Sequence, residues 1–349
     1  MSSSSAAAQH RSNWDAVMQM AIDAALKGVR GANPLVGAVI LSESGELLST
    51  GWHRGAGTPH AEADALAKIT PEQAKGATMV VSLEPCNHLG RMPACSQSII
   101  DAGMKRVVYA VDDPDQHAAG GAQRLAEAGL EVVGQVKGSE GAELNRRWLN
   151  AVQQQRPYTT VHIAQTVDGR IAAADGTSQW ISSPESLAAN HALRARVDAM
   201  LVGTGTVFAD NPRLTARSAD GTLAASQPLR VVLGNRAIPE DAALRADENW
   251  LQLEYHDPAR AGHELWQRGI RHLMVEGGAQ VSAAFLAADL IDELMVSIAP
   301  TVLGAGIPSV GDIGVHTLAA ARHFSWDAAA PALRHGSDLT FTLIPEGTN

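Results

Sequence analysis

Strand-like and helix-like segments alternate along this chain in two successive series, and this alternation constrains the fold more than any other feature. In the first series, apolar spacing predicts helices over residues 14–27, 61–69, 94–102 and 123–128. It predicts strands over residues 36–41, 46–51, 78–83, 106–111 and 130–136, the first two joined as a hairpin. Helices that alternate with strands cover a sheet, so we expect an α/β fold.

A polar stretch separates the two series. Residues 150–157 read Asn-Ala-Val-Gln-Gln-Gln-Arg-Pro and end in a helix breaker. We therefore expect one domain over residues 1–152 and a second over 153–349, as the length of 349 residues also suggests. The second series predicts strands over 159–164, 199–203, 229–233, 271–275 and 293–299, and helices over 184–197, 259–268 and 279–288. Residues 236–255 show no clear pattern.

Composition excludes several classes of protein. The chain has 27 basic and 37 acidic residues, a net charge of −10, and no run of lysine or arginine, so we expect no nucleic-acid partner. We also expect no membrane partner, because no segment approaches the ~18 consecutive apolar residues of a membrane span. The Ser/Ala-rich first residues lack the features of a secretory signal and predict a frayed tail. Two cysteines are too few for a disulfide scaffold, which favours a cytoplasmic location.

Four residues of the first half form a pattern typical of zinc chemistry. His60 and Glu62 stand where a helix begins, Cys86 follows a strand, and Cys95 starts another helix. One imidazole and two thiolates suit a catalytic zinc with an open fourth position, where zinc lowers the pKa of water towards ~7. Glu62 can then carry a proton from this water to departing ammonia. Zinc deaminases of bases show H-x-E with P-C-x-x-C, whereas eight residues separate the cysteines here.

Two plainer interpretations of these residues remain. The cysteines can be buried apolar side chains, as free cysteine usually is. A structural zinc is the other alternative, and His88 would supply its fourth ligand. The joint placement of His-x-Glu, Pro-Cys and both cysteines of the chain favours the catalytic interpretation.

Glycines in the second half follow two predicted strands. They occur in Val202-Gly-Thr-Gly-Thr206 and in Val275-Glu-Gly-Gly278, where backbone N–H groups can approach a phosphate. Neither matches G-x-G-x-x-G, so a standard Rossmann domain is not supported. Taken alone, each glycine pair favours a tight turn over a cofactor site. Arg194 and Arg217 are candidate phosphate ligands, although single arginines are mostly solvated.

Longer motifs indicate a family. His60-Ala-Glu62, the stretch Glu84-Pro-Cys86-Asn-His88-Leu-Gly-Arg91-Met-Pro-Ala-Cys95, and Asn33-Pro-Leu-Val-Gly37 resemble the deaminase half of the bifunctional riboflavin-biosynthesis deaminase/reductases. Cysteines at this spacing are typical of that family. Thr166-Val-Asp-Gly-Arg170, Gly176-Thr-Ser-Gln-Trp180 and Asp210-Asn-Pro-Arg-Leu214 look like its reductase half. The similarity runs from about residue 33 to residue 306.

This resemblance implies a cytidine-deaminase-like zinc domain followed by a dihydrofolate-reductase-like domain that uses NADPH. It implies deamination of 2,5-diamino-6-ribosylamino-4(3H)-pyrimidinone 5′-phosphate, then reduction of the ribosyl group to ribityl, in a homodimer or larger assembly. His60, Cys86 and Cys95 would bind Zn²⁺, and Glu62 would be catalytic. The NADPH residues would be Ala164, Trp180, Thr206, Asp210, Asn235 and Gly278, which begins a turn reaching Ala284. The substrate residues would be Asn33, His88 and Arg91 in the deaminase, and Ser178, Arg194, Leu214, Arg217 and Glu276 in the reductase.

The chain departs from the family pattern at a few positions. Met92 replaces a usual Thr, Asp115-Gln116 replaces Asn-Pro, and Thr166, Asn211 and Gly234 replace Ser, Asp and Asp. Asn33-Pro34 fits a rigid turn as well as a pocket wall. The alternatives are a nucleoside or tRNA base deaminase, a nucleotide-binding protein with a structural zinc, and an enzyme acting on a similar pyrimidine in secondary metabolism.

Overall fold

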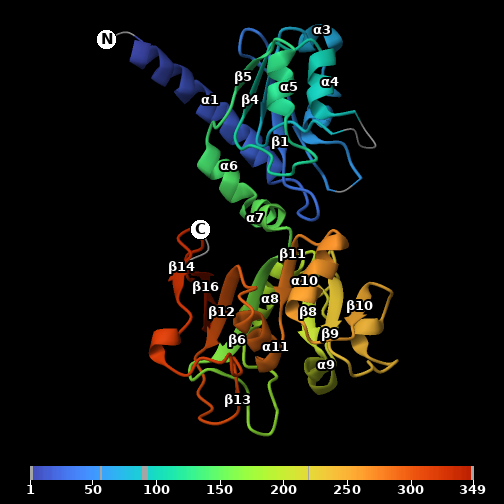
Figure 1. The fold of residues 1–349 in the computed structure, drawn as a ribbon, viewed down its shortest axis with the longest axis vertical. Coiled ribbons are helices and arrows are strands. Elements are labelled where there is room, and N and C mark those ends of the chain that lie inside the picture. Colours follow the sequence, from blue (N-terminus) through green and yellow to red (C-terminus); the bar gives the residue numbers. More distant parts are fainter. Residues whose placement is uncertain (1–2, 56, 89–92, 219, 347–349) are drawn as a thin grey trace. The chain divides into compact units, whose positions relative to one another are not determined.

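The structure is a computed structural model that describes residues 3–55, 57–88, 93–218 and 220–346, with the backbone alone for residues 3–13. The chain divides into two compact units, Met1–Gln154 and Gln155–Asn349 (Figure 1). Each unit has its own sheet and its own hydrophobic core. Among the helices that the structure describes, none has the length and apolar character needed to cross a membrane.

A mixed sheet of order β2-β1-β3-β4-β5 forms the centre of the first unit. Its strands are β1 (Gly37–Leu41), β2 (Leu47–Trp52), β3 (Thr78–Val81), β4 (Arg106–Tyr109) and β5 (Glu131–Val133). The expected hairpin is confirmed, because β1 pairs antiparallel with β2, with Gly37 opposite Trp52. Strands β3, β4 and β5 are parallel, so their carboxyl ends lie at one edge of the sheet.

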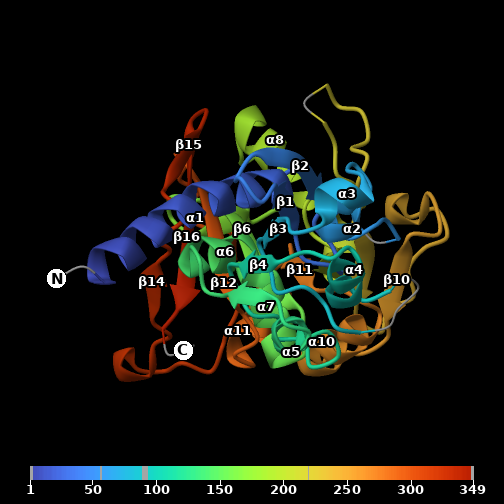
Figure 2. The same cartoon turned by 90° about the horizontal axis from the view of Figure 1, so that it is seen from above.

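Helices cover both faces of this sheet. They are α1 (Ser3–Ala25), α2 (Ala61–Leu66), α3 (Pro71–Ala74), α4 (Cys95–Asp101), α5 (Gly121–Glu127), α6 (Gly138–Leu144) and α7 (Arg146–Gln154). On one face, Met18 and Ile22 of α1 pack with Leu144 of α6 against Val80 and Val108. Helices α2, α4 and α5 pack on the other face. Figure 2 shows α1 and α6 on one side of β1, β3 and β4, and α2 and α4 on the other.

One prediction for the first unit is wrong. Helix α1 begins at Ser3, so the expected frayed tail is helical; alanine, which is frequent there, is the strongest helix former. The polar stretch at the expected boundary is helical as far as Gln154, and Leu149 and Ala151 of this helix, α7, are buried. Burial of this apolar side outweighs the polar composition of the stretch. The two units divide after Gln154, within the polar stretch 150–157 where the sequence placed the boundary.

The second unit contains a larger sheet of order β10-β9-β8-β11-β6-β12-β16-β14 within the described residues, with β15 also paired to β16. The strands from β10 to β12 are parallel, and β16 joins antiparallel. They are β6 (Tyr158–Thr166), β8 (Ala199–Gly203), β9 (Leu229–Leu233), β10 (Trp250–Leu253), β11 (His272–Val275), β12 (Glu293–Ala299), β14 (Phe324–Trp326), β15 (Leu333–His335) and β16 (Asp338–Pro345). A separate pair joins β7 (Arg170–Ala172) to β13 (Ile307–Pro308).

Helices also cover both faces of the larger sheet. Helices α10 (Pro258–Gln267) and α11 (Ala279–Ala287) pack on one face, and α8 (Pro184–Arg194) and α9 (Thr204–Asp210) on the other. The strands expected over residues 229–233 and 293–299 are confirmed at the same bounds. The stretch without a clear pattern contains the short helix η1 (Ala243–Arg245) and β10. The strands beyond residue 300 had no clear sequence signal, and another short helix, η2 (Leu318–Ala320), lies among them.

Candidate active sites

His60, Cys86 and Cys95 meet in one place, although three different segments supply them. His60 precedes α2, Cys86 lies in the loop after β3, and Cys95 is the first residue of α4. The Nδ1 atom of His60 lies 3.6 Å from the Sγ of Cys86 and 3.3 Å from that of Cys95. Within the described ranges, these residues form a group whose ligand atoms all lie within 4.8 Å of one another, a geometry that fits a metal ion.

The two thiols are free, buried and electrostatically coupled. A hydrogen bond from the Cys95 thiol, together with His60, lowers the pKa of Cys86 to about 4, even though burial opposes this. The same contact with Cys86 raises the pKa of Cys95. The backbone N–H of Cys95 also donates to the Cys86 sulfur over 3.4 Å. Because the thiolate is the form that binds metals, this arrangement suits zinc.

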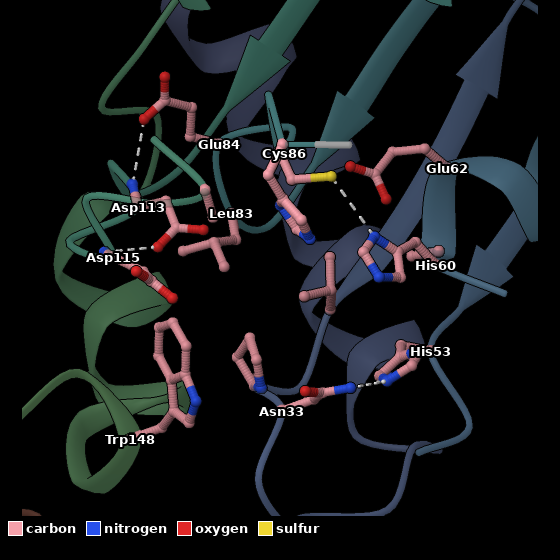
Figure 3. A pocket seen from close by; sticks show the side chains of 15 residues that line it. Asn33, His53, His60, Glu62, Leu83, Glu84, Cys86, Asp113, Asp115 and Trp148 are labelled. Carbon is pink, nitrogen blue, oxygen red and sulfur yellow. Dashed lines mark hydrogen bonds between the residues drawn. The ribbon is translucent and has the colours of Figure 1, made fainter. Parts of the chain in front are cut away.

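Glu62 lies beside this group on the first turn of α2 and is only 3% exposed. Burial, and then the nearby Cys86 thiolate, raise the pKa of its carboxyl group to about 7. Figure 3 shows its carboxylate next to the Cys86 sulfur and the His60 ring. A carboxyl group with a pKa near neutrality can both accept and release a proton at this position.

A cavity of about 210 Å³ opens beside His60, Cys86 and Glu62. Asn33 and Pro34 form part of its wall, so this segment lines a pocket. A second cavity of about 460 Å³ lies against the same histidine and both cysteines, and Asn33 and His88 line both cavities. His88 is exposed and does not belong to the metal-binding group found among the described residues. Arg91 and Met92 lie outside the described residues.

Several residues that line the first cavity were not among the expected site residues. Among them are His53, Asp113 and Trp148, whose polar or aromatic side chains can contact a ligand (Figure 3). Trp148 comes from α7, a helix that the sequence analysis did not predict. Burial raises the pKa of Asp113 to about 6, and its carboxylate accepts the backbone N–H of Asp115 over 2.9 Å. For Asp113, the Asp113-Pro114-Asp115 motif was a signal available in the sequence. The sequence around His53 and Trp148 contains no such signal.

In the second unit, the carboxyl ends of β8 and β11 place the glycine segments side by side. Because these strands are parallel neighbours, Gly203 at the end of β8 and Glu276 after β11 lie at the same edge of the sheet. A Cβ atom on Gly277 would lie 2.5 Å from the Cβ of Val281, and one on Gly203 would lie 2.7 Å from Val281 Cγ2. These two glycines therefore serve packing. Gly278 has space around it and lines a cavity, so its backbone can contact a ligand.

Glu276 is a largely buried carboxylate at this edge of the sheet. It pairs with Arg194 of α8, and its Oε1 also lies 3.6 Å from Nδ1 of His162. Burial alone would raise the pKa of Glu276. The charge of Arg194, and after it the contact with His162, outweigh the effect of burial and hold this pKa well below its usual range. His162, which sequence reasoning missed, also contacts the Ser297 hydroxyl over 3.2 Å. This network fixes an ionised carboxylate at the pocket floor.

Two adjoining cavities contain most of the residues expected for the reductase. One of about 260 Å³ is lined by Ala164, Trp180, Thr206, Asp210 and Gly278, all expected for NADPH. Another of about 540 Å³ is lined by Ser178, Arg194, Leu214, Arg217 and Glu276, all expected for the substrate. The two sets are not separated, because both cavities are lined by Ser178, Trp180, Thr206, Asp210 and Glu276. Asn235 lies outside both, exposed after β9. Trp180 is 71% exposed, which leaves its ring free to pack on a bound cofactor.

Comparisons with known proteins agree with this two-part architecture. Residues 11–111 match the cytidine and deoxycytidylate deaminase zinc-binding region, and residues 157–330 match the RibD C-terminal domain. The riboflavin biosynthesis protein RibD of Mycobacterium tuberculosis is 41% identical over 334 residues, covering 95% of this chain and 97% of that protein. RibD of Corynebacterium ammoniagenes is 44% identical over 313 residues, covering 88% of this chain and 92% of that protein.

The chain belongs to the RibD family. Solved structures support the same assignment for the fold. Acinetobacter baumannii RibD superimposes with a TM-score of 0.88 at 32% identity, covering 96% of this chain and 99% of that one. The fold is thus a cytidine-deaminase-like zinc domain followed by a RibD-type reductase domain, as the sequence predicted. The cofactors of a RibD enzyme are zinc in the first domain and NADPH in the second.

Proposed function

We propose that the chain catalyses two consecutive reactions of riboflavin biosynthesis, a hydrolytic deamination and an NADPH-dependent reduction. The observation that supports this most is that one chain contains both the His60-Cys86-Cys95 group beside the buried Glu62 and a RibD C-terminal domain. Residues 1–152 would deaminate 2,5-diamino-6-ribosylamino-4(3H)-pyrimidinone 5′-phosphate. Residues 153–349 would then reduce its ribosyl group to ribityl.

The donor set of the first unit fits zinc, because one imidazole and two thiols converge and leave one tetrahedral position open. Zinc bound there would lower the pKa of a coordinated water molecule to about 7. Glu62 would accept one proton of the attacking water. It would then deliver this proton to the departing amino group, so that the ring carbon gains oxygen and ammonia leaves. Its burial keeps bulk water from competing for that proton.

In the second unit, the cavity residues would hold the two reactants in contact. Trp180 and Thr206, with the Gly278 backbone, would hold the nicotinamide nucleotide, which supplies a hydride when bound. Arg217 would bind the substrate phosphate. Arg194 already has Glu276 as its partner, so this pair would present one carboxylate and one guanidinium to the sugar hydroxyls. The cofactor-binding and substrate-binding residues would thus bind and orient the two reactants, which is what hydride transfer mainly requires.

Variants that affect one reaction alone test this assignment. Glu62→Ala should abolish ammonia release while zinc stays bound, because Glu62 is not one of the three ligands. The same protein should still oxidise NADPH when it receives the already deaminated intermediate. Loss of zinc in this variant would make Glu62 a ligand, and unchanged ammonia release would overturn its role in proton transfer.

We also propose that the chain forms a homodimer or larger assembly in the cytoplasm. Trp326, Leu333 and Leu339 of the paired strands β14, β15 and β16 are 69%, 52% and 46% exposed, which supports an apolar contact surface. Free cysteines that act as metal ligands suit a reducing compartment. Light scattering on the purified protein tests the assembly, and a monomeric mass would overturn it.

A further inference from the structure

His53 follows β2, and the groups around its ring determine which ring nitrogen donates a hydrogen bond and which accepts one. Its Nδ1 lies 3.0 Å from the Pro59 carbonyl oxygen and 3.4 Å from the Thr58 hydroxyl oxygen. The Thr58 hydroxyl donates its own proton to the Gly55 carbonyl over 2.7 Å, so its oxygen can only accept at His53. Both neighbours of Nδ1 are therefore acceptors, and the proton of the neutral imidazole belongs on Nδ1.

The other ring nitrogen then determines how Asn33 is turned. Nε2 of His53 lies 3.0 Å from Nδ2 of Asn33, a contact drawn as a dashed line in Figure 3. With the proton on Nδ1, Nε2 is an acceptor, so the Asn33 amide must present its NH₂ group to it. This argument fixes the amide orientation without relying on an oxygen and nitrogen being told apart. The Oδ1 atom of Asn33 consequently faces away from His53.

Asn33 lines both cavities that border His60 and Cys86. No hydrogen bond occupies its Oδ1 within the described part of the chain, so this oxygen is available to a ligand. The His53 ring is 4% exposed and packs edge-on against the His60 ring at 5.5 Å between centroids. Its position is therefore fixed close to the expected reaction centre, although it was not among the expected site residues.

We propose that His53 is a positioning residue of the deaminase that makes Asn33 present a hydrogen-bond acceptor to the aminopyrimidine. This inference rests on the proposed deaminase function. An exocyclic amino group offers N–H donors, whereas the carbonyl group that replaces it in the product is an acceptor. An acceptor at Asn33 therefore favours the substrate over the product, and a reversed amide would favour the product.

Two substitutions separate the hydrogen-bonding role of His53 from its role in packing. His53→Gln keeps a donor for Pro59 and an acceptor for Asn33, whereas His53→Leu fills the space and has neither. We expect the Leu variant to raise the KM of the deaminase roughly 10- to 100-fold, with the Gln variant within about 3-fold of the original protein. Zinc content and reduction of the deaminated intermediate serve as controls and should not change.

The outcomes distinguish this inference from the proposed function. Absence of ammonia from the unmodified protein would overturn the deaminase itself. Ammonia from the unmodified protein, with equal KM in the Leu and Gln variants, would overturn the role of His53 alone.

Histidine ¹⁵N spectra of the zinc-loaded protein test the same contact without activity. The His53 signal, assigned by its loss in His53→Gln, should show the neutral form protonated at Nδ1. A proton on Nε2 would overturn the proposal. If the Leu variant loses zinc and its KM cannot be compared, these spectra provide the test.

Discussion

Glu62→Gln should remove deaminase activity and stabilise the first unit at the same time. Glu62 is buried, and its pKa rises from 4.5 in water to about 7 in the folded protein without metal. A carboxyl group with a raised pKa costs no stability below pH 4.5, where it is protonated in both states. The cost grows as the pH rises and is complete above pH 7, where the folded state must hold the charge.

The size of this effect follows from the shift of the pKa. A rise from 4.5 to about 7 corresponds to about 3 kcal/mol at ~1.4 kcal/mol per pH unit. Glutamine has nearly the shape of the protonated side chain and carries no charge at any pH. In chelator-treated protein at pH 8, we therefore expect Glu62→Gln to unfold roughly 6–12 °C higher, since ~1 kcal/mol raises Tm by about 2–4 °C in a unit of this size. At pH 4.5 the difference should disappear.

Differential scanning calorimetry at the two pH values measures this difference directly. Glu46→Gln is the matched control, because Glu46 is exposed in the turn between β1 and β2 and should show no pH-dependent difference. Zinc should shrink the effect at pH 8, because a nearby cation stabilises the carboxylate. A Gln variant that is less stable than the original protein at pH 8, or equally shifted at both pH values, would refute the argument. The variant should also lose about 10²–10⁴-fold in kcat for ammonia release.

Three further predictions concern the metal and the reductase. Chelation of zinc should stop ammonia release and leave reduction of the deaminated intermediate intact; loss of both activities would contradict separate sites. Arg217→Ala should raise the reductase KM about 10-fold or more, as removal of a charge-assisted contact does, and unchanged kinetics would remove Arg217 from the phosphate site. Glu276→Gln leaves the partly buried Arg194 without its charged partner, so we expect a loss of about 1–3 kcal/mol in urea unfolding at pH 7. Because the pKa of Glu276 is lowered on folding, this difference should fade as the pH falls below about 4.5, and a constant difference would contradict it.

Sequence patterns predicted the parts of the fold where burial and local periodicity agree. Strands β9 and β12 carry strong apolar runs, and the structure places them at the expected bounds. Helix α7 had no clear sequence signal, because only Leu149 and Ala151 of its residues are buried and a polar stretch begins within it. Strands β14 and β15 are short and largely exposed, so their apolar pattern is weak.

The same contrast applies to the candidate sites. His60, Cys86 and Cys95 could be predicted because metal chemistry restricts residue type so strongly that their spacing is informative. His53 and His162 could not, since each acts through contacts with residues distant in the sequence: Asn33 for His53, and Glu276 and Ser297 for His162. Only the folded chain brings these partners together.

The most direct test of the central claim supplies the zinc-loaded protein with the diaminopyrimidine ribosyl phosphate and NADPH. Ammonia release and the loss of nicotinamide absorbance are followed in the same sample. We expect one NADPH oxidised for each ammonia released, with ammonia appearing first. Ammonia without oxidation would contradict the reductase assignment, and the absence of both signals would contradict the account as a whole.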